Sequence, residues 1–136
     1  MNTKRIILSG VVAGIIIFLI GNISYFASMG LYETQTTDIW KPMKMPVWMG
    51  YLFTGNLMMG LLMAVVYSYL QKALSGNAIK KGAAFGVLVW LAGSLPQFIG
   101  LYLTVAMSDA LLLSWIIQYL ISNVAAGISI AYLYKE

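Results

Sequence analysis

The sequence predicts an all-α membrane protein, a polytopic four-helix bundle in one integral domain spanning residues 1–136. Four apolar segments cover residues 6–28, 46–70, 82–107 and 110–134, and none of them contains Asp, Glu, Lys or Arg. Each segment is longer than the roughly 20 residues that a helix needs to cross a hydrocarbon core of about 30 Å. The chain is 61% hydrophobic and 9% charged, which is a composition of the membrane class.

The first apolar segment follows Lys4 and Arg5, a pattern that resembles the start of a signal peptide. The segment is longer than a typical signal-peptide core, and no clear small-residue cleavage site follows it. We therefore expect it to be retained as the first membrane span.

The second apolar segment is preceded by the only long connection, residues 29–45. This connection is polar in its middle and amphipathic from residue 39 to residue 45, so its second half is expected to lie in the membrane interface with Trp40 among the headgroups. Pro46 has the fixed backbone angle that suits the first turn of a helix.

The third and fourth apolar segments carry their own local signals. Ser75, Gly76 and Asn77 predict a turn before the third span. Pro96 lies within that span, where it removes a backbone hydrogen bond and predicts a kink. Ser108 is a candidate N-cap for the fourth span.

The basic residues predict the orientation of the chain. The positive-inside rule places the side with more lysine and arginine in the cytoplasm, and one side has six against two on the other. We therefore expect a bacterial-type inner membrane protein with both termini cytoplasmic. The six are Lys4, Arg5, Lys72, Lys80, Lys81 and Lys135, and the two are Lys41 and Lys44.

A faint internal repeat relates the two halves of the chain. Gly10 and Gly14 in the first span match Gly82 and Gly86 in the third, and an Asn-x-x-x-Gly pattern recurs at Asn56 and Asn123. Two spans per unit predict a 2+2 parallel repeat about an axis along the membrane normal. Because small residues let helices approach closely, the GxxxG motifs are expected to pack the first span against the third, with a homodimer seam as the alternative.

Amides within the spans are the main hint of a binding site. An unpaired amide in hydrocarbon is costly, so these groups should face the interior, either as hydrogen bonds between helices or as the wall of a polar pocket. The predicted pocket opens outward and takes an uncharged or zwitterionic, mostly apolar ligand, because a cavity without charges does not compensate a buried ion. Its predicted residues are Asn22, Tyr25, Asn56 and Gln97 on the wall and Trp48 and Tyr51 near the mouth.

Two other functions are kept as alternatives. Met43, Met45 and Met49 would supply thioethers for Cu(I) binding or transport, although Met is also an ordinary packing residue. A lipid-modifying enzyme would use Glu33, just after the first span. The chain has no Cys and no His, which removes thiolate and imidazole catalysis and the usual zinc and haem ligands. We expect no enzyme activity and no cofactor.

Three stretches resemble an uncharacterised family of small four-helix bacterial membrane proteins, known as a domain of unknown function. They are residues 21–26, residues 82–96 with the Gly82-x-x-x-Gly86-x-x-x-Trp90 pattern, and residues 118–127. That family tends to carry a Trp-Tyr pair late in its first span, where this chain has Ser24 and Tyr25. The resemblance implies the four-helix fold and no activity.

The function predicted from the sequence is therefore a small integral membrane binding or accessory protein, or a small carrier. Its expected partners are membrane lipids and a small apolar ligand, with a homodimer as the alternative assembly. The net charge of +4 does not indicate nucleic-acid binding, because the basic residues lie at span ends rather than on one face.

Overall fold

The computed structural model describes residues 2–34 and 44–134, which form an all-α four-helix bundle. Four helices are long and apolar enough to cross a membrane, as the sequence predicted. Between the first two lies α2, one short turn; the interfacial segment predicted after it falls mostly outside the described residues. The helices are α1 (Thr3–Ala27), α2 (Met29–Glu33), α3 (Met45–Leu70), α4 (Ala78–Val89), the π-helical turn η2 (Trp90–Ser94), α5 (Leu95–Thr104) and α6 (Asp109–Leu133).

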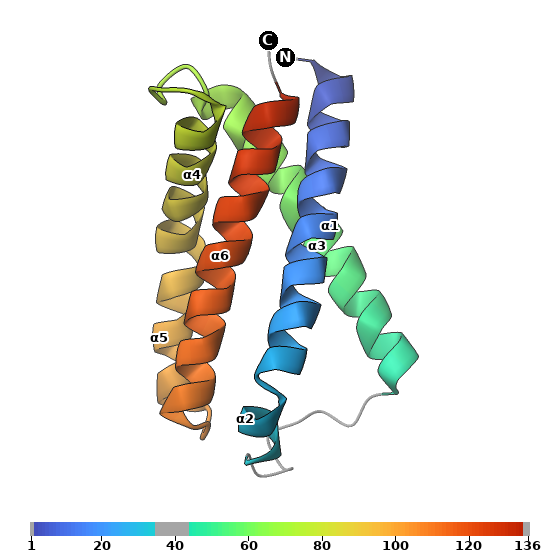
Figure 1. Cartoon of the computed structure of the whole chain (residues 1–136), viewed down its shortest axis with the longest axis vertical. Coiled ribbons are helices and arrows are strands. Elements are labelled where there is room, and N and C mark those ends of the chain that lie inside the picture. The colour runs from blue at the N-terminus through green and yellow to red at the C-terminus, as the bar shows by residue number, and fades with distance from the viewer. Residues whose placement is uncertain (1, 35–43, 135–136) are drawn as a thin grey trace.

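Both described ends of the chain lie at one end of the bundle, together with the connection between α3 and α4 (Figure 1). We call this the terminal end. The opposite end, which holds α2 and the connection between α5 and α6, is the distal end.

Local chemistry sets the helix ends where the sequence predicted them. The Ser108 hydroxyl accepts a hydrogen bond from the Leu111 N–H at 3.2 Å and so caps α6. Pro46 lies in the first turn of α3, where its missing N–H costs nothing. Before α4, Gly76 takes a φ of 103°, a left-handed conformation that favours glycine, and Asn77 caps the helix.

The third span is broken by the π-helical turn η2, which ends two residues before Pro96. Proline has no N–H to donate to the preceding turn, so the backbone hydrogen bonds change there to the wider π-helical spacing. The regular helix resumes as α5, with Pro96 in its first turn. The Trp90 indole crosses to α6 and donates to the Ile116 carbonyl at 3.2 Å. The predicted irregularity at Pro96 is therefore a π turn held by an interhelical hydrogen bond.

Glycines bring α1 and α3 into backbone contact. A Cβ on Gly14 would lie 2.7 Å from the Asn56 carbonyl oxygen and from the Leu57 Cα, so no side chain fits. A Cβ on Gly60 would in turn clash with the backbone of Gly10 and Gly14. Small residues on both helices thus make one close seam.

The same seam recurs between α4 and α6. A Cβ on Gly86 would lie 2.6 Å from the Val124 Cα, and one on Gly82 would lie 2.6 Å from the Gly127 carbonyl oxygen. The predicted packing of the first span against the third through these glycines was therefore wrong. Each GxxxG motif instead packs against the Asn-x-x-x-Gly motif of the next span, so each half of the chain is a helical hairpin with its own seam.

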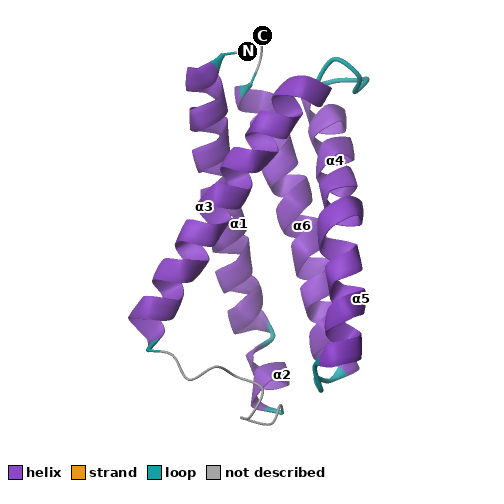
Figure 2. Cartoon of the chain, turned by 180° about the vertical axis from the view of Figure 1, so that it is seen from behind, coloured by secondary structure: helices purple, strands orange, loops and turns teal. Residues whose placement is uncertain are grey.

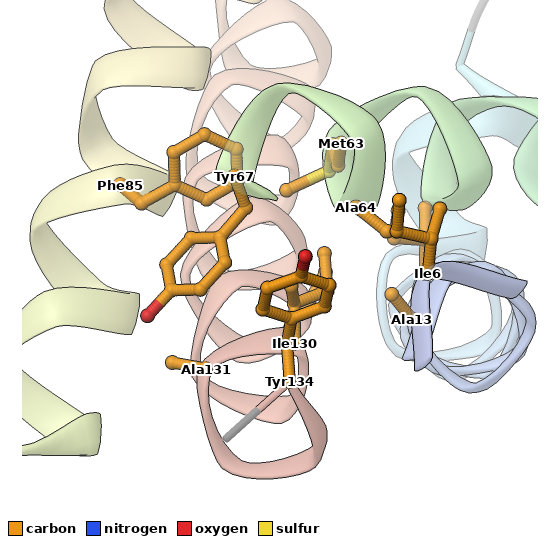
Figure 3. Close-up of a cluster of buried hydrophobic side chains, with 11 residues drawn as sticks. Ile6, Ala13, Met63, Ala64, Tyr67, Phe85, Ile130, Ala131 and Tyr134 are labelled. Carbon is orange, nitrogen blue, oxygen red and sulfur yellow. The ribbon is translucent and has the colours of Figure 1, made fainter. Parts of the chain in front are cut away.

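The repeat extends beyond the glycines. With an offset of 67 residues, Trp48, Asn56, Gly60 and Ala64 of α3 match identical residues of α6, and Tyr67 matches Tyr134, which follows α6. The last matched pair, Tyr67 and Tyr134, lies buried in the core cluster at the terminal end, with ring centroids 6.2 Å apart (Figure 3). The repeat thus places two equivalent tyrosines in contact where the hairpins meet.

The two hairpins join unequally. α1 packs extensively on α6, whereas α3 meets the second hairpin only near the terminal end, where Tyr67 contacts Phe85 with ring centroids 5.2 Å apart. Towards the distal end α3 diverges from α4 and α5 (Figure 2). Between residues 44 and 55 every described residue of α3 is exposed except the half-buried Met49. α3 is thus in contact with the second hairpin near the terminal end and stands away from it towards the distal end.

Candidate functional site

Two of the predicted site residues lie on α1, in its distal half. Asn22 is half-buried, and its amide nitrogen donates to the Phe18 carbonyl of the same helix at 2.8 Å. The amide oxygen of Asn22 keeps its capacity to accept. Tyr25 is half-buried, and its ring meets that of Tyr32 edge-on at 4.8 Å.

Three predicted site residues lie on α3. Asn56 is half-buried, and its side chain makes no hydrogen bond with any described residue. Trp48 and Tyr51 are exposed on the distal turns of the helix, on the part that diverges from the bundle. Their equivalents in α6, Trp115 and Gln118, are half-buried.

Gln97 is exposed on α5, one residue after Pro96. It lies 11 residues beyond Gly86, or about 16 Å at 1.5 Å per residue. Asn22 lies eight residues beyond Gly14, or about 12 Å. Because Gly14 and Gly86 hold equivalent places in the two seams, Asn22 and Gln97 share a similar depth. Asn56 is level with Gly14 and lies deeper.

Three aromatic residues, Tyr25, Tyr32 and Trp115, pack together at the distal end, between α1, α2 and α6. The Trp115 indole donates to the Tyr32 hydroxyl at 2.6 Å, which ties α2 to the fourth span. Burial raises the pKa of Tyr32, the Trp115 hydrogen bond lowers it, and the net shift is upward. The phenol therefore stays neutral and available as an acceptor. Trp115 is the equivalent of Trp48, which has no such cover.

The residues of the alternative functions are only partly described. Met43 lies outside the described residues, and Met45 and Met49 stand one turn apart at the start of α3. Glu33 ends α2 and is exposed. In the part of the chain that the structure describes, no three His, Cys, Asp or Glu residues form a group that would hold a metal.

A cavity of about 410 Å³ lies at the terminal end, away from the predicted pocket. Its wall includes the core tyrosines Tyr67 and Tyr134, together with Gln71, Lys72 and Lys81. The Lys81 ammonium donates to the Gln71 carbonyl at 3.1 Å, which fixes it beside the end of α3. From the sequence alone, these lysines indicate topology and not a cavity. The sequence signal for this place is the repeat of Tyr67 at Tyr134, which brings two tyrosines together where the hairpins meet.

Comparisons with known proteins give no relative. No protein-family model matches the chain, and neither a curated protein nor a solved structure matches it. The family resemblance described above therefore rests on its three stretches of sequence, and the case for a function rests on the geometry.

Proposed function

We propose that this chain is a small integral membrane binding protein, or a small carrier, whose ligand enters between the two hairpins from the distal end. The observation that carries the proposal is the divergence of α3 from α5 towards the distal end, which we interpret as an opening between the hairpins. The bundle is closed around Tyr67 and Phe85 at one end, and α3 stands away from the second hairpin at the other.

The chemistry of the open side defines the ligand class. No Asp, Glu, Lys or Arg lies within the apolar segments 6–28, 46–70, 82–107 and 110–134. Apolar side chains such as Val47 and Leu52 are exposed on the distal part of α3, and Asn22, Asn56 and Gln97 add amides at two depths. A mostly apolar molecule with one or two hydrogen-bonding groups, uncharged or zwitterionic, matches this lining.

The orientation belongs to the same proposal. With the terminal end in the cytoplasm, as the lysine and arginine bias predicts, the opening faces outward from a bacterial-type inner membrane. The ligand would then be taken from the outer leaflet or from the outer aqueous space.

Native mass spectrometry of the full-length protein, purified in a mild detergent, tests this function. We expect a retained small molecule, and we expect its occupancy to fall about tenfold in Asn22→Leu or Gln97→Leu, since one lost buried hydrogen bond is worth about 1–1.5 kcal/mol. Ser129→Ala, a polar change in the terminal half of α6, is the control and should leave occupancy unchanged. Wild-type protein that retains no ligand, or variants that retain it fully, would contradict the proposal.

A further inference from the structure

The cavity at the terminal end is built by three elements that are far apart in sequence. α3 contributes Tyr67 with the adjoining Gln71 and Lys72, α4 contributes Lys81, and Tyr134 follows α6. Its volume of about 410 Å³ is within the range of about 300–1,000 Å³ typical of small-molecule sites. The cavity lies at the ends of the spans, where headgroups and water meet the protein.

The charge around this cavity is of one sign. Lys72 and Lys81 line it, and Lys4, Arg5 and Lys80 lie at the same end of the molecule. The carboxylates that the structure describes, those of Glu33 and Asp109, lie at the distal end; Glu136, beside Lys135, is outside the described residues. The lysines of the cavity therefore have no described counter-ion.

A tyrosine hydroxyl at the cavity also lacks a partner among the described residues. Tyr67 is 3% exposed and lines the cavity, yet its hydroxyl has no hydrogen-bond partner among the described residues. Figure 3 shows its ring extending from α3 towards Ala131 of α6. The Tyr134 hydroxyl accepts a long hydrogen bond of 3.4 Å from the Asn2 N–H and keeps its own proton to donate.

The start of α4 adds backbone donors. Gly76 and Ala78 are part of the cavity wall, and Ala78 is the first residue of this 12-residue helix. The Asn77 side chain satisfies the Lys80 N–H, while the first N–H groups of a helix have no partner within the helix and carry its positive dipole end. Anions bind readily at such a terminus.

We propose that this cavity binds a phosphate group, with Lys72 and Lys81 as the cationic partners and the Tyr67 hydroxyl as a neutral donor. Lysine pairs and phenols are suitable donors for phosphate oxygens, and basic pockets at the cytoplasmic ends of spans hold anionic lipid headgroups. The phosphate is carried by an anionic phospholipid or by a soluble phosphate. This site is separate from the distal opening, so either proposal can fail while the other stands.

Native mass spectrometry of the full-length protein with added phosphatidylglycerol, phosphatidylcholine or inorganic phosphate tests the site. We expect wild type to retain phosphatidylglycerol at least about tenfold better than phosphatidylcholine. The double variant Lys72→Gln/Lys81→Gln should lose this preference, and Tyr67→Phe, which keeps the ring in the core, should weaken it several-fold. Retention of inorganic phosphate that depends on the same lysines, without lipid preference, would support the site and assign its ligand to soluble phosphates.

The matched control is Lys4→Gln/Lys80→Gln, which removes the same charge at the same end but outside the cavity wall. It should change retention by less than about twofold. Equal losses in the two double variants would show that general surface charge attracts the anion and would overturn the site. Retention of neither probe by wild type would overturn it as well. Melting temperatures of all variants in detergent would show whether each remains folded.

Discussion

Gly14 and Gly86 occupy equivalent places in the two hairpins, and at both the neighbouring helix leaves no room for a side chain. By contrast, nothing lies within 4 Å of a Cβ built on Gly93 or Gly100, both in the third span. Glycines at the seams therefore permit backbone contact between two helices. Gly93 and Gly100 have no neighbouring helix within reach of a Cβ.

A leucine at a seam glycine should have a larger effect than a leucine at a glycine that faces open space. Gly86→Leu should destabilise the fold by at least about 1–3 kcal/mol, because its side chain would force α4 away from the backbone of α6. Gly100→Leu should have a much smaller effect, since its Cβ meets open space. Thermal unfolding in detergent measures both, and equal losses would remove the special status of the seam.

Asn56 and Asn123 show how equivalent residues diverge. Both lie on seams, but Asn123 is 3% exposed and donates to the Ser94 hydroxyl at 3.3 Å and to the Tyr119 carbonyl at 2.8 Å. Asn56 is half-buried, and its side chain has no hydrogen bond within the described residues. Asn123 thus stabilises its hairpin, while Asn56 keeps the donors and acceptor that a ligand needs.

At the scale of elements, α3 and α6 share a sequence pattern but differ in how far their distal turns are buried. Four aligned residues are identical in the two helices, and a fifth pair is Tyr67 and Tyr134. The distal part of α3 is exposed, whereas the distal part of α6 has buried residues at Leu111 and Leu112. The connection before α3 is long and the one before α6 is short.

Spin labels test this opening at the element scale. The chain has no Cys, so cysteine pairs can be labelled without background. The pair Val47→Cys/Ile99→Cys joins α3 and α5 at the distal end, and Val66→Cys/Ile79→Cys joins α3 and α4 at the terminal end. Electron-spin distance measurements should give the longer distance for the distal pair. Similar distances would mean that the bundle is closed at both ends.

At the scale of the whole molecule, the two hairpins meet along α1 and α6, while α3 joins the second hairpin only near the terminal end. Tyr67, Phe85 and Tyr134 form the aromatic contacts of the closed end. The same end carries the cavity with its lysines, whereas the open end carries the amides. The lysine side chains and the amide side chains therefore lie at different levels along the length of the bundle.

Reporter fusions test the orientation of the whole molecule. The bias of six basic residues against two predicts that a fusion at residue 38 reports the outer compartment and one at the C terminus reports the cytoplasm. Removing charges should weaken this result, for example in Lys80→Gln/Lys81→Gln. The same signal from both fusions would contradict the model of four spans with cytoplasmic ends.

The sequence by itself determined the number and limits of the spans, because hydrocarbon excludes charged residues and each span must satisfy its backbone internally. It also determined the helix caps, the irregularity at Pro96 and the existence of a repeat, since these depend on residues near one another in the chain. The sequence did not determine which helix packs against each GxxxG motif, because the motif predicts close packing with a helix but not the identity of that helix.

Only the tertiary structure decided that each motif joins consecutive spans, that α1 packs on α6 and that α3 diverges. It also brought together Tyr67, Lys81 and Tyr134, which are far apart along the chain and line one cavity. Hydropathy does not distinguish the neighbours of an apolar helix, because lipid and protein offer it nearly the same apolar surroundings. Backbone proximity and side-chain shape therefore select the pairs, and they act only once the helices are assembled.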